Sequence, residues 1–211
     1  MEFWHQRWFN NQIGFHRLVA NDLLIEHWPS LKCQPGANVL VPLCGKTLDM
    51  HWLKEQGHNV IGIELVEKAV RSFFEDAQLT PHIESKGEHT MFTTEDITIV
   101  QGDVFTLPET MANCQAWYDR AAMVALPSEM RARYVDQIYS LCSPGAVGLM
   151  ITFAYPQEQM QGPPFSLPDE EVFEVFSKRF EVELLESINL EDEKDRGLSQ
   201  ITSSVFKIKR T

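Results

Sequence analysis

The end of the chain places the strongest constraint on its fold. Two strand-like segments, 181–190 and 199–210, are separated by little more than the polar stretch EDEKDRG. A connection between parallel strands needs a dozen or more residues and is usually a helix. Because the stretch is too short for that, the two strands are predicted to pair antiparallel, as a hairpin.

Strand and helix patterns alternate along the rest of the chain. Buried strands are predicted at 38–43, 60–65, 97–105, 116–123 and 146–155, and helices at 11–28, 47–56, 66–78, 128–142 and 169–180. Residues 79–96 show no sustained period and are predicted to be irregular. The alternation predicts an α/β fold with a doubly wound, mostly parallel seven-stranded sheet, helices on both faces and the antiparallel C-terminal hairpin. This is the plan of class I S-adenosylmethionine-dependent methyltransferases.

Length and composition limit the number of domains and the kinds of partner. The chain has 211 residues and lacks internal repeats and linker-like stretches, so a single domain, 1–211, is predicted. Within it, 1–28 is expected to form an aromatic lid and helix, and 36–211 the sheet core. A formal charge of −12 disfavours a nucleic-acid partner, which needs clustered Lys and Arg.

The cysteines and the apolar runs indicate the cellular compartment of the protein. The four cysteines have no CxxC spacing, and no metal site is predicted. The N-terminus has no apolar signal core, and no apolar run is long enough to span a bilayer. We therefore expect a cytoplasmic protein without a membrane partner, and a monomer by default.

The loop after the first predicted strand holds a partial phosphate-binding motif. Ligands of open α/β sheets bind beyond the carboxyl ends of the strands, so this loop is a candidate site. The tripeptide GKT at 45–47 matches the end of a P-loop, but the first glycine of that motif would fall at Leu40. Pro42 also lacks an N–H group that could hold phosphate. Triphosphate binding is therefore disfavoured, and the single Gly45 leaves no G-x-G-x-x-G dinucleotide fingerprint.

The next three strands each end in residues that suit a ligand. Glu64 follows Gly45 by 19 residues, about the distance at which an acidic residue accepts hydrogen bonds from ribose hydroxyls. Its alternative role is to cap the strand end. Asp103 and Val104 could read an adenine edge and pack on its ring, or form an ordinary turn. Arg120 could belong to the site, or form a structural salt bridge with the aspartate before it.

Several stretches together resemble one family. They are FWHQRW and GFH near the N-terminus, PLCGKTLDMHWL, GHNVIGIEL, GDVFTLP, YDRAAMVALP and GPPFSLP. These stretches extend over nearly the whole chain and resemble the thiopurine S-methyltransferases, in particular the short bacterial members. PLCGK followed by GHxVxGxE is the most specific part. The resemblance places the GK pair in a loop that binds the methyl donor, which answers the question of the partial P-loop.

The resemblance implies a cofactor and a set of site residues. S-adenosylmethionine is the implied cofactor, in contact with Trp4, Trp8, Leu43, Gly45, Glu64, Asp103, Val104 and Arg120. The implied residues that close over the acceptor are Phe15, Pro163 and Pro164. Arg196 lies in the loop where the family has a substrate-side arginine, although its spacing to Gly197 differs from the family pattern. Trp4 and Trp8 are four residues apart, so on a helix they share one face, either over the cofactor sulfonium or simply docked on the core.

The prediction is an enzyme that transfers a methyl group from S-adenosylmethionine to the sulfur of aromatic or heterocyclic thiols such as thiopurines. The resemblance extends the acceptors to selenium and tellurium species. In-line transfer depends on alignment, so Arg120 is expected to orient the reactants without a covalent role. His16 could assist proton removal or be purely structural. A nicotinamide-dependent oxidoreductase, disfavoured by the missing fingerprint and the antiparallel ending, and a non-catalytic nucleotide-binding module are the alternatives.

Overall fold

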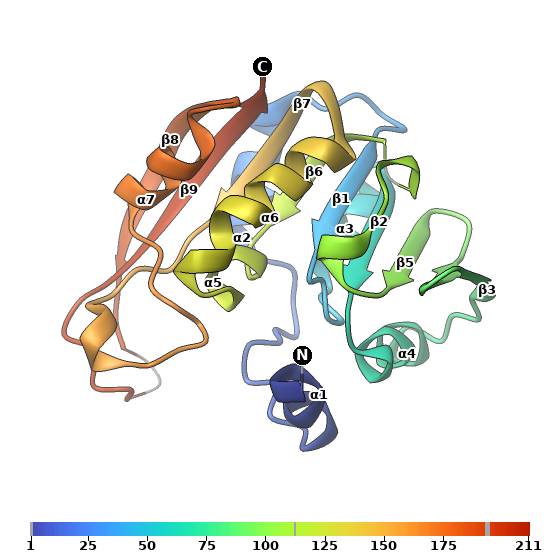
Figure 1. Cartoon of the computed structure of the whole chain (residues 1–211), viewed down its shortest axis with the longest axis horizontal. Helices are drawn as coiled ribbons and strands as arrows, with labels where there is room; N and C mark the ends of the chain where they lie inside the picture. Colours follow the sequence, from blue (N-terminus) through green and yellow to red (C-terminus); the bar gives the residue numbers. More distant parts are fainter. Residues whose placement is uncertain (1, 112, 193–194) are drawn as a thin grey trace.

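A mixed β-sheet forms the centre of the computed structural model, which describes residues 2–111, 113–192 and 195–211 (Figure 1). Its strands are β1 (Asn38–Pro42), β2 (Asn59–Glu64), β3 (His82–Lys86), β4 (His89–Thr93), β5 (Ile97–Gln101), β6 (Cys114–Asp119), β7 (Cys142–Ile151), β8 (Phe180–Leu190) and β9 (Ile201–Arg210). The α-helices are α1 (Glu2–Phe9), α2 (Asp22–His27), α3 (Asp49–Glu55), α4 (Glu67–Asp76), α5 (Ala122–Ala125), α6 (Ser128–Leu141) and α7 (Asp169–Phe176). Short 3-10 helices are η1 (Trp28–Leu31), η2 (Val104–Thr106), η3 (Glu109–Met111) and η4 (Gln157–Gln159).

The order of the strands determines where a ligand can bind. Within the described residues the order is β3-β4-β5-β2-β1-β6-β7-β9-β8. β1, β2, β5, β6 and β7 run parallel, and β9 lies antiparallel between β7 and β8. The chain winds from β1 outward to β5 and returns to β6 on the other side of β1. The carboxyl ends of β1 and β6 therefore flank the topological switch point, and the predicted doubly wound sheet and C-terminal hairpin are confirmed.

Two hydrophobic cores cover the two faces of the sheet. On one face, α6 and α7 pack side chains such as Ile138 and Phe176 against the strands. On the other face, α2 and α4 contribute Leu24 and Phe73. The central strands are buried on both sides, which explains why β1 reads as a continuous apolar run rather than an alternating one.

The sheet has more strands than predicted, because residues 79–96 form a hairpin instead of an irregular excursion. β3 and β4 pair antiparallel, and β4 pairs antiparallel with β5. All residues of β3 are exposed at the edge of the sheet, whereas His89 and Phe92 of β4 are buried. An exposed strand has no buried face, so its sequence carries no apolar alternation that would reveal it. The predicted count of seven strands is therefore wrong, and the described residues form nine.

The N-terminal segment also differs from the single helix predicted over 11–28. Only its second half is helical, as α2 and η1, and Leu18 and Val19 of the predicted apolar stripe are 85% and 59% exposed. The side-chain oxygen of Asn21 accepts hydrogen bonds from two backbone N–H groups of the first turn of α2. This cap sets the start of the helix after the first part of the stripe.

The close approach of β6 and β7 depends on a glycine. Gly148 of β7 lies against the indole ring of Trp117, and a Cβ atom at position 148 would overlap that ring. We expect Gly148→Ala to lower the free energy of unfolding by roughly 1–3 kcal/mol, the usual cost of overpacking a core. Urea denaturation measures this difference.

Gly14→Ala is the matched control, because a Cβ atom there would have no neighbour within 4 Å. We expect it to change the free energy of unfolding by less than about 0.5 kcal/mol. A Gly148→Ala variant as stable as Gly14→Ala would show that Trp117 moves aside without cost.

Candidate active site

A cavity of about 570 Å³ opens beyond the carboxyl ends of β1, β2 and β5. The strand ends contribute Leu43, Gly45, Glu64, Asp103 and Val104, the N-terminal segment contributes Phe3, Trp4, Arg7, Trp8 and Phe15, and the loop before α7 contributes Gly162, Pro163, Pro164 and Phe165. All predicted site residues therefore meet in one cavity, except Arg120 and Arg196. Its volume is in the range of small-molecule sites.

The turn after β1 presents backbone to the cavity. Leu43 and Gly45 both have left-handed conformations, with φ of 50° and 53°. This conformation costs a non-glycine residue roughly 1–2 kcal/mol, so the surroundings must hold Leu43 in place. A Cβ atom on Gly45 would lie 3.1 Å from the ring of Trp8. Glycine at this position therefore lets the indole pack closely over the turn.

Glu64, the last residue of β2, is 7% exposed and lines the cavity. Its two carboxylate oxygens accept hydrogen bonds from the backbone N–H groups of Gly45 and Val66, both at 2.8 Å. Burial raises the pKa of Glu64, and these N–H groups act in the opposite direction. Each oxygen retains a lone pair for a further donor. The predicted capping role is thus present, and a role in ribose binding stays a prediction that this geometry allows.

Asp103 and Val104 follow β5 at the cavity wall. Asp103 caps η2, because its Oδ1 accepts a hydrogen bond from the N–H of Phe105 at 3.0 Å. The hydroxyl of Thr106 donates to the carbonyl of Asp103 and lies 3.2 Å from Nε2 of His89. His89 belongs to β4, so the strand that the sequence analysis missed supports the loop of two predicted site residues.

The N-terminal segment covers the cavity with a series of aromatic rings. Helix α1 lies by the carboxyl ends of the parallel strands, apart from the bulk of the sheet (Figure 1). Trp8 is buried in a small cluster with α4. Edge-to-face contacts join Trp8 to Phe15, Phe15 to Trp4 and Trp4 to Phe3, with ring centroids 5.9, 6.0 and 5.2 Å apart. Both tryptophans line the cavity, as expected for residues on one helix face.

The loop with the two predicted prolines forms a further part of the cavity wall. The hydroxyl of Tyr155 donates to the carbonyl of Pro164 at 2.6 Å, and the N–H of Phe165 donates to the carbonyl of Val124 at 2.7 Å. The peptide bonds before Pro163 and Pro164 are cis. These contacts hold the loop against the segment that follows β6, so the wall is anchored at both sides.

Arg120 and Arg196 lie outside the cavity lining. Nε of Arg120 is 3.4 Å from Oδ2 of Asp49, a carboxylate that is almost fully buried. Arg120, which follows the last residue of β6, does not pair with Asp119, the alternative considered from the sequence; the carboxylate of Asp119 has other hydrogen-bond donors. Arg196 pairs with Asp192 at 3.1 Å in the loop between β8 and β9.

Asp49 connects the N-terminal segment to the end of β6. Its Oδ1 accepts a hydrogen bond from the backbone N–H of Asn21 at 2.8 Å, and its Oδ2 accepts one from the hydroxyl of Tyr118 at 3.1 Å. Burial and the charge of Asp49 raise the pKa of Tyr118, so its hydroxyl remains a donor. Sequence reasoning missed Asp49, although it lies within the stretch PLCGKTLDMHWL, because all of these partners are distant in sequence.

Two further residues near the cavity, Arg7 and His16, have basic side chains. Arg7 lines the cavity and was also missed, although its position three residues after Trp4 places the two on one side of a helix. His16 does not line the cavity. Burial and the charge of Lys46 lower the pKa of His16, so its imidazole is neutral near pH 7.

Asp119, at the end of β6, lies on the side of the strand away from Asp49. Its carboxylate accepts hydrogen bonds from the hydroxyl of Tyr134 at 2.6 Å and from the N–H groups of Ala122 and Met123 at 3.0 and 3.3 Å. These bonds fix the start of α5, whose residues line the cavity. Burial raises the pKa of Asp119 to about 6, although all three donors lower it.

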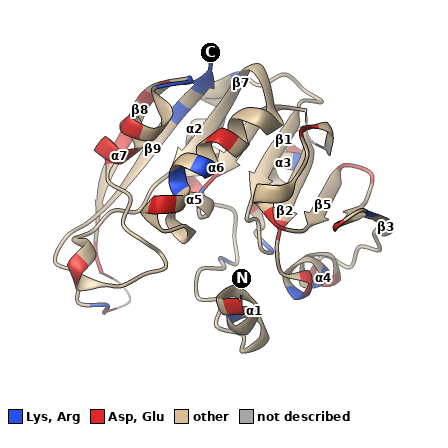
Figure 2. Cartoon of the chain, in the orientation of Figure 1, with Lys and Arg blue, Asp and Glu red and all other residues tan. Residues whose placement is uncertain are grey.

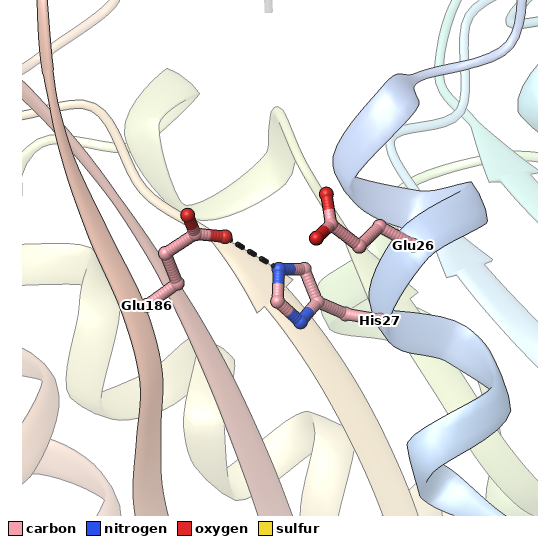
Figure 3. Close-up of side chains that lie close together, drawn as sticks. All are labelled: Glu26, His27 and Glu186. Carbon is pink, nitrogen blue, oxygen red and sulfur yellow. Dashed lines mark hydrogen bonds and ion pairs between the residues drawn. The ribbon is translucent and has the colours of Figure 1, made fainter.

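A second group of titratable residues lies away from the cavity, between α2 and β8 (Figure 3). Nε2 of His27 is 2.7 Å from Oε2 of Glu186, and a carboxylate oxygen of Glu26 lies within 4.8 Å of both. A β-bulge between Leu184 and Glu186 interrupts the pairing of β8 with β9. Bulges re-aim side chains, and here the contact between His27 and Glu186 connects the edge strand to the helix that follows the N-terminal segment.

The charged residues of the helices are of mixed sign. Acidic and basic residues are interspersed on helices such as α4 and α6 (Figure 2). Among the helices of the described residues, none has the length and apolar character needed to cross a membrane.

The fold and the cavity define a class of protein. A doubly wound sheet, an antiparallel C-terminal hairpin and a strand-end cavity with an acidic residue at the end of β2 are the features of class I S-adenosylmethionine-dependent methyltransferases. A solved structure agrees: the 1,6-didemethyltoxoflavin-N1-methyltransferase of Burkholderia thailandensis, with bound 1,6-didemethyltoxoflavin and S-adenosylhomocysteine. It is 16% identical, covers 100% of this chain and 86% of its own, and has a TM-score of 0.67.

The sequence comparisons identify the family. The family model for thiopurine S-methyltransferase matches residues 1–211. Thiopurine S-methyltransferases of Pseudomonas aeruginosa (strain UCBPP-PA14) and Shewanella loihica (strain PV-4) are 44% and 45% identical, over 99% of this chain and 98% of each relative. The chain therefore belongs to the thiopurine S-methyltransferase family. It is a methyltransferase whose cofactor is S-adenosylmethionine, and the oxidoreductase and non-catalytic alternatives are left without support.

The raised pKa of Asp119 predicts a pH dependence of stability. The pKa is about 6 in the folded protein and 3.8 for the ordinary group, so between these values the folded state holds the proton more tightly. The contribution of Asp119 to stability is then full below about pH 4 and is lost as the pH rises to about 6. The loss amounts to about 3 kcal/mol, at 1.36 kcal/mol per pKa unit.

Asp119→Asn removes this titration. We expect the free energy of unfolding of the wild type, minus that of the variant, to fall between pH 4 and 6 and to stay level above. Urea denaturation across this range measures the difference. A difference that is flat, or that rises with pH, would contradict the raised pKa.

Proposed function

We propose that the chain transfers the methyl group of S-adenosylmethionine to the sulfur of aromatic and heterocyclic thiols such as thiopurines. One observation carries the proposal: a single cavity is lined both by the ends of β1, β2 and β5 and by aromatic and proline residues. Strand ends at a switch point suit the nucleoside of the donor. Flat apolar walls suit a flat, apolar acceptor.

The residues present fit the cofactor. Glu64 has lone pairs available beside its two N–H partners, and ribose hydroxyls are the donors that an acidic residue at the end of β2 accepts. Asp103 and Val104 would take the adenine, with the carboxylate at its edge and the valine on its ring. Leu43 and Gly45 would offer backbone to the rest of the donor.

The aromatic residues would serve both substrates. Trp4 and Trp8 present π-faces that attract a cation such as a sulfonium, and they exclude water from it. Phe15, Pro163 and Pro164 would close over the acceptor. These residues come from three segments of the chain, so the cavity is complete only when the N-terminal segment lies in place.

Alignment supplies most of the catalysis in this proposal. S-adenosylmethionine, when bound, supplies an activated methyl group on its sulfonium. Aromatic thiols ionise readily near neutral pH, so the protein needs no strong base, and holding the sulfur in line accounts for the gain in rate. Arg120 is proposed to orient the reactants from beside the cavity, with Asp49 holding its guanidinium. Arg196 is proposed as an acceptor-side residue, which requires it to leave Asp192.

The proposal also covers further acceptors, the excluded partners and the state of the protein. Selenium and tellurium species are included as acceptors, because they are soft nucleophiles like a thiolate. Nucleic acids and membranes are excluded as partners, in keeping with the charge of −12. We further propose that residues 1–211 are one domain, and that the protein is a monomer in the cytoplasm.

A methyl-transfer assay tests the proposed function. Purified protein is given S-adenosylmethionine with labelled methyl and one acceptor at a time: a thiopurine, a thiophenol, selenite or tellurite. We expect label in the thiopurine and the thiophenol, with phenol, the oxygen analogue of thiophenol, as the matched poor acceptor. Transfer to phenol as fast as to thiophenol, or transfer to neither thiol, would refute sulfur as the acceptor atom.

A Glu64 variant tests the proposed donor site. We expect Glu64→Gln to weaken binding of S-adenosylhomocysteine roughly tenfold or more, because charge-assisted hydrogen bonds contribute about 1.5–3 kcal/mol each. Isothermal titration calorimetry measures the affinity. Glu67→Gln is the matched control, since Glu67 lies three residues further on, at the exposed end of an ion pair with Arg71. If a folded Glu64→Gln variant keeps its affinity for S-adenosylhomocysteine, Glu64 only holds the loops together and does not bind the donor.

A further inference from the structure

Arg7 is a cation inside the cavity that forms no ion pair with a described residue. Its side chain lines the cavity and is half-buried. Among the described residues, no carboxylate forms an ion pair with it; its guanidinium lies over the ring of Phe3, 5.0 Å from the centroid. Two acidic residues, Glu64 and Asp103, also line the cavity, but both are engaged by backbone N–H groups at the strand ends.

A series of aromatic rings lies between Arg7 and the proposed donor site. Trp8 packs over Gly45, in the turn that Glu64 holds. From Trp8 the rings continue through Phe15 and Trp4 to Phe3, in three successive contacts. Arg7 lies over the last ring of this series. Three ring contacts therefore separate the ring beneath the guanidinium from Trp8, the ring that packs over the turn of the proposed donor site.

The position and the chemistry of Arg7 together favour an anion. A charge in a partly desolvated cavity interacts more strongly with an opposite charge than it would in water. A guanidinium offers a planar fork of donors that matches a carboxylate or a delocalised ring anion in two bonds at once. The ring of Phe3 supports the guanidinium from one face and leaves its edge available for such bonds.

We propose that Arg7 binds a negative charge on the acceptor, at the edge of its ring opposite to the reacting sulfur. The enzyme would then prefer aromatic thiols that carry a second, remote anionic group over uncharged thiols of the same shape. This inference rests on the proposed function, because it needs an aromatic thiol in the cavity. It adds a specificity-determining residue on the N-terminal helix, which neither the strand ends nor the proline loop supplies.

Two acceptors of matched shape test the proposal: 4-mercaptobenzoate and 4-methylthiophenol. Both present an aromatic thiolate, and only the first has a charge at the opposite end. We expect Arg7→Met to lower kcat/KM for 4-mercaptobenzoate roughly tenfold or more, mostly through KM, because a charge-assisted pair is lost. For 4-methylthiophenol we expect less than about a threefold change. Arg7→Lys, which keeps the charge and loses the fork, should fall between the wild type and Arg7→Met for the charged thiol.

Two controls separate Arg7 from the rest of the site. Arg17→Met removes an arginine that pairs with the exposed Asp22 and does not line the cavity, and it should leave the preference between the thiols unchanged. The affinity for S-adenosylhomocysteine, measured by calorimetry, should be the same in Arg7→Met and in the wild type.

Four results would overturn the proposal. An equal fall in kcat/KM with both thiols in Arg7→Met would mean that Arg7 stabilises the helix and does not bind the acceptor charge. A loss of S-adenosylhomocysteine affinity with an unchanged preference would assign Arg7 to the donor. A wild type that methylates neither thiol would refute the proposed function and the role of Arg7 with it. An active wild type together with an unaltered preference in Arg7→Met would refute the role of Arg7 alone.

Discussion

Two hydrogen bonds from backbone N–H groups to one buried carboxylate, that of Glu64, hold the loops after β1 and β2 together. Removing this carboxylate from water is unfavourable, which is why burial raises its pKa, and the two N–H groups offset part of that cost. An amide would offer a single acceptor oxygen, so only an acid can accept both bonds with its two oxygens. The turn at Gly45, the packing of Trp8 over that turn and the inner end of the cavity all depend on this arrangement.

A second buried carboxylate organises the outer part of the site. Asp49 accepts bonds from the backbone of Asn21 and from Tyr118, and it pairs with Arg120. Asn21 in turn caps α2, so the point at which the N-terminal segment joins the sheet is fixed by the same group that holds Arg120. A charge that is nearly fully buried is tolerated only where it is paired and hydrogen-bonded, and here its partners come from two separate segments, the start of α2 and the end of β6.

The sequence predicts those features that repeat along the chain or follow from topology. Parallel strands with buried faces were identifiable as apolar runs, and residues such as Glu64 and Asp103 meet because carboxyl ends of parallel strands share one edge. Features that depend on tertiary contacts were not identifiable. The exposed β3 has no burial pattern, the apolar Leu18 is 85% exposed in spite of its helical spacing, and Arg120 turns to Asp49, 71 positions away, rather than into the cavity.

The N-terminal helix contributes four residues to the cavity wall: Phe3, Trp4, Arg7 and Trp8. With eight residues, α1 is too short to be stable alone in water, so its order depends on tertiary contacts. Its buried anchor is Trp8, in a cluster much smaller than either main core. Trp8 faces the turn at Gly45, whereas Arg7 lies over Phe3. If the donor orders α1 through Trp8 and the acceptor orders it through Arg7, the first molecule to bind leaves less ordering for the second. Their binding free energies are then expected to be coupled positively and reciprocally.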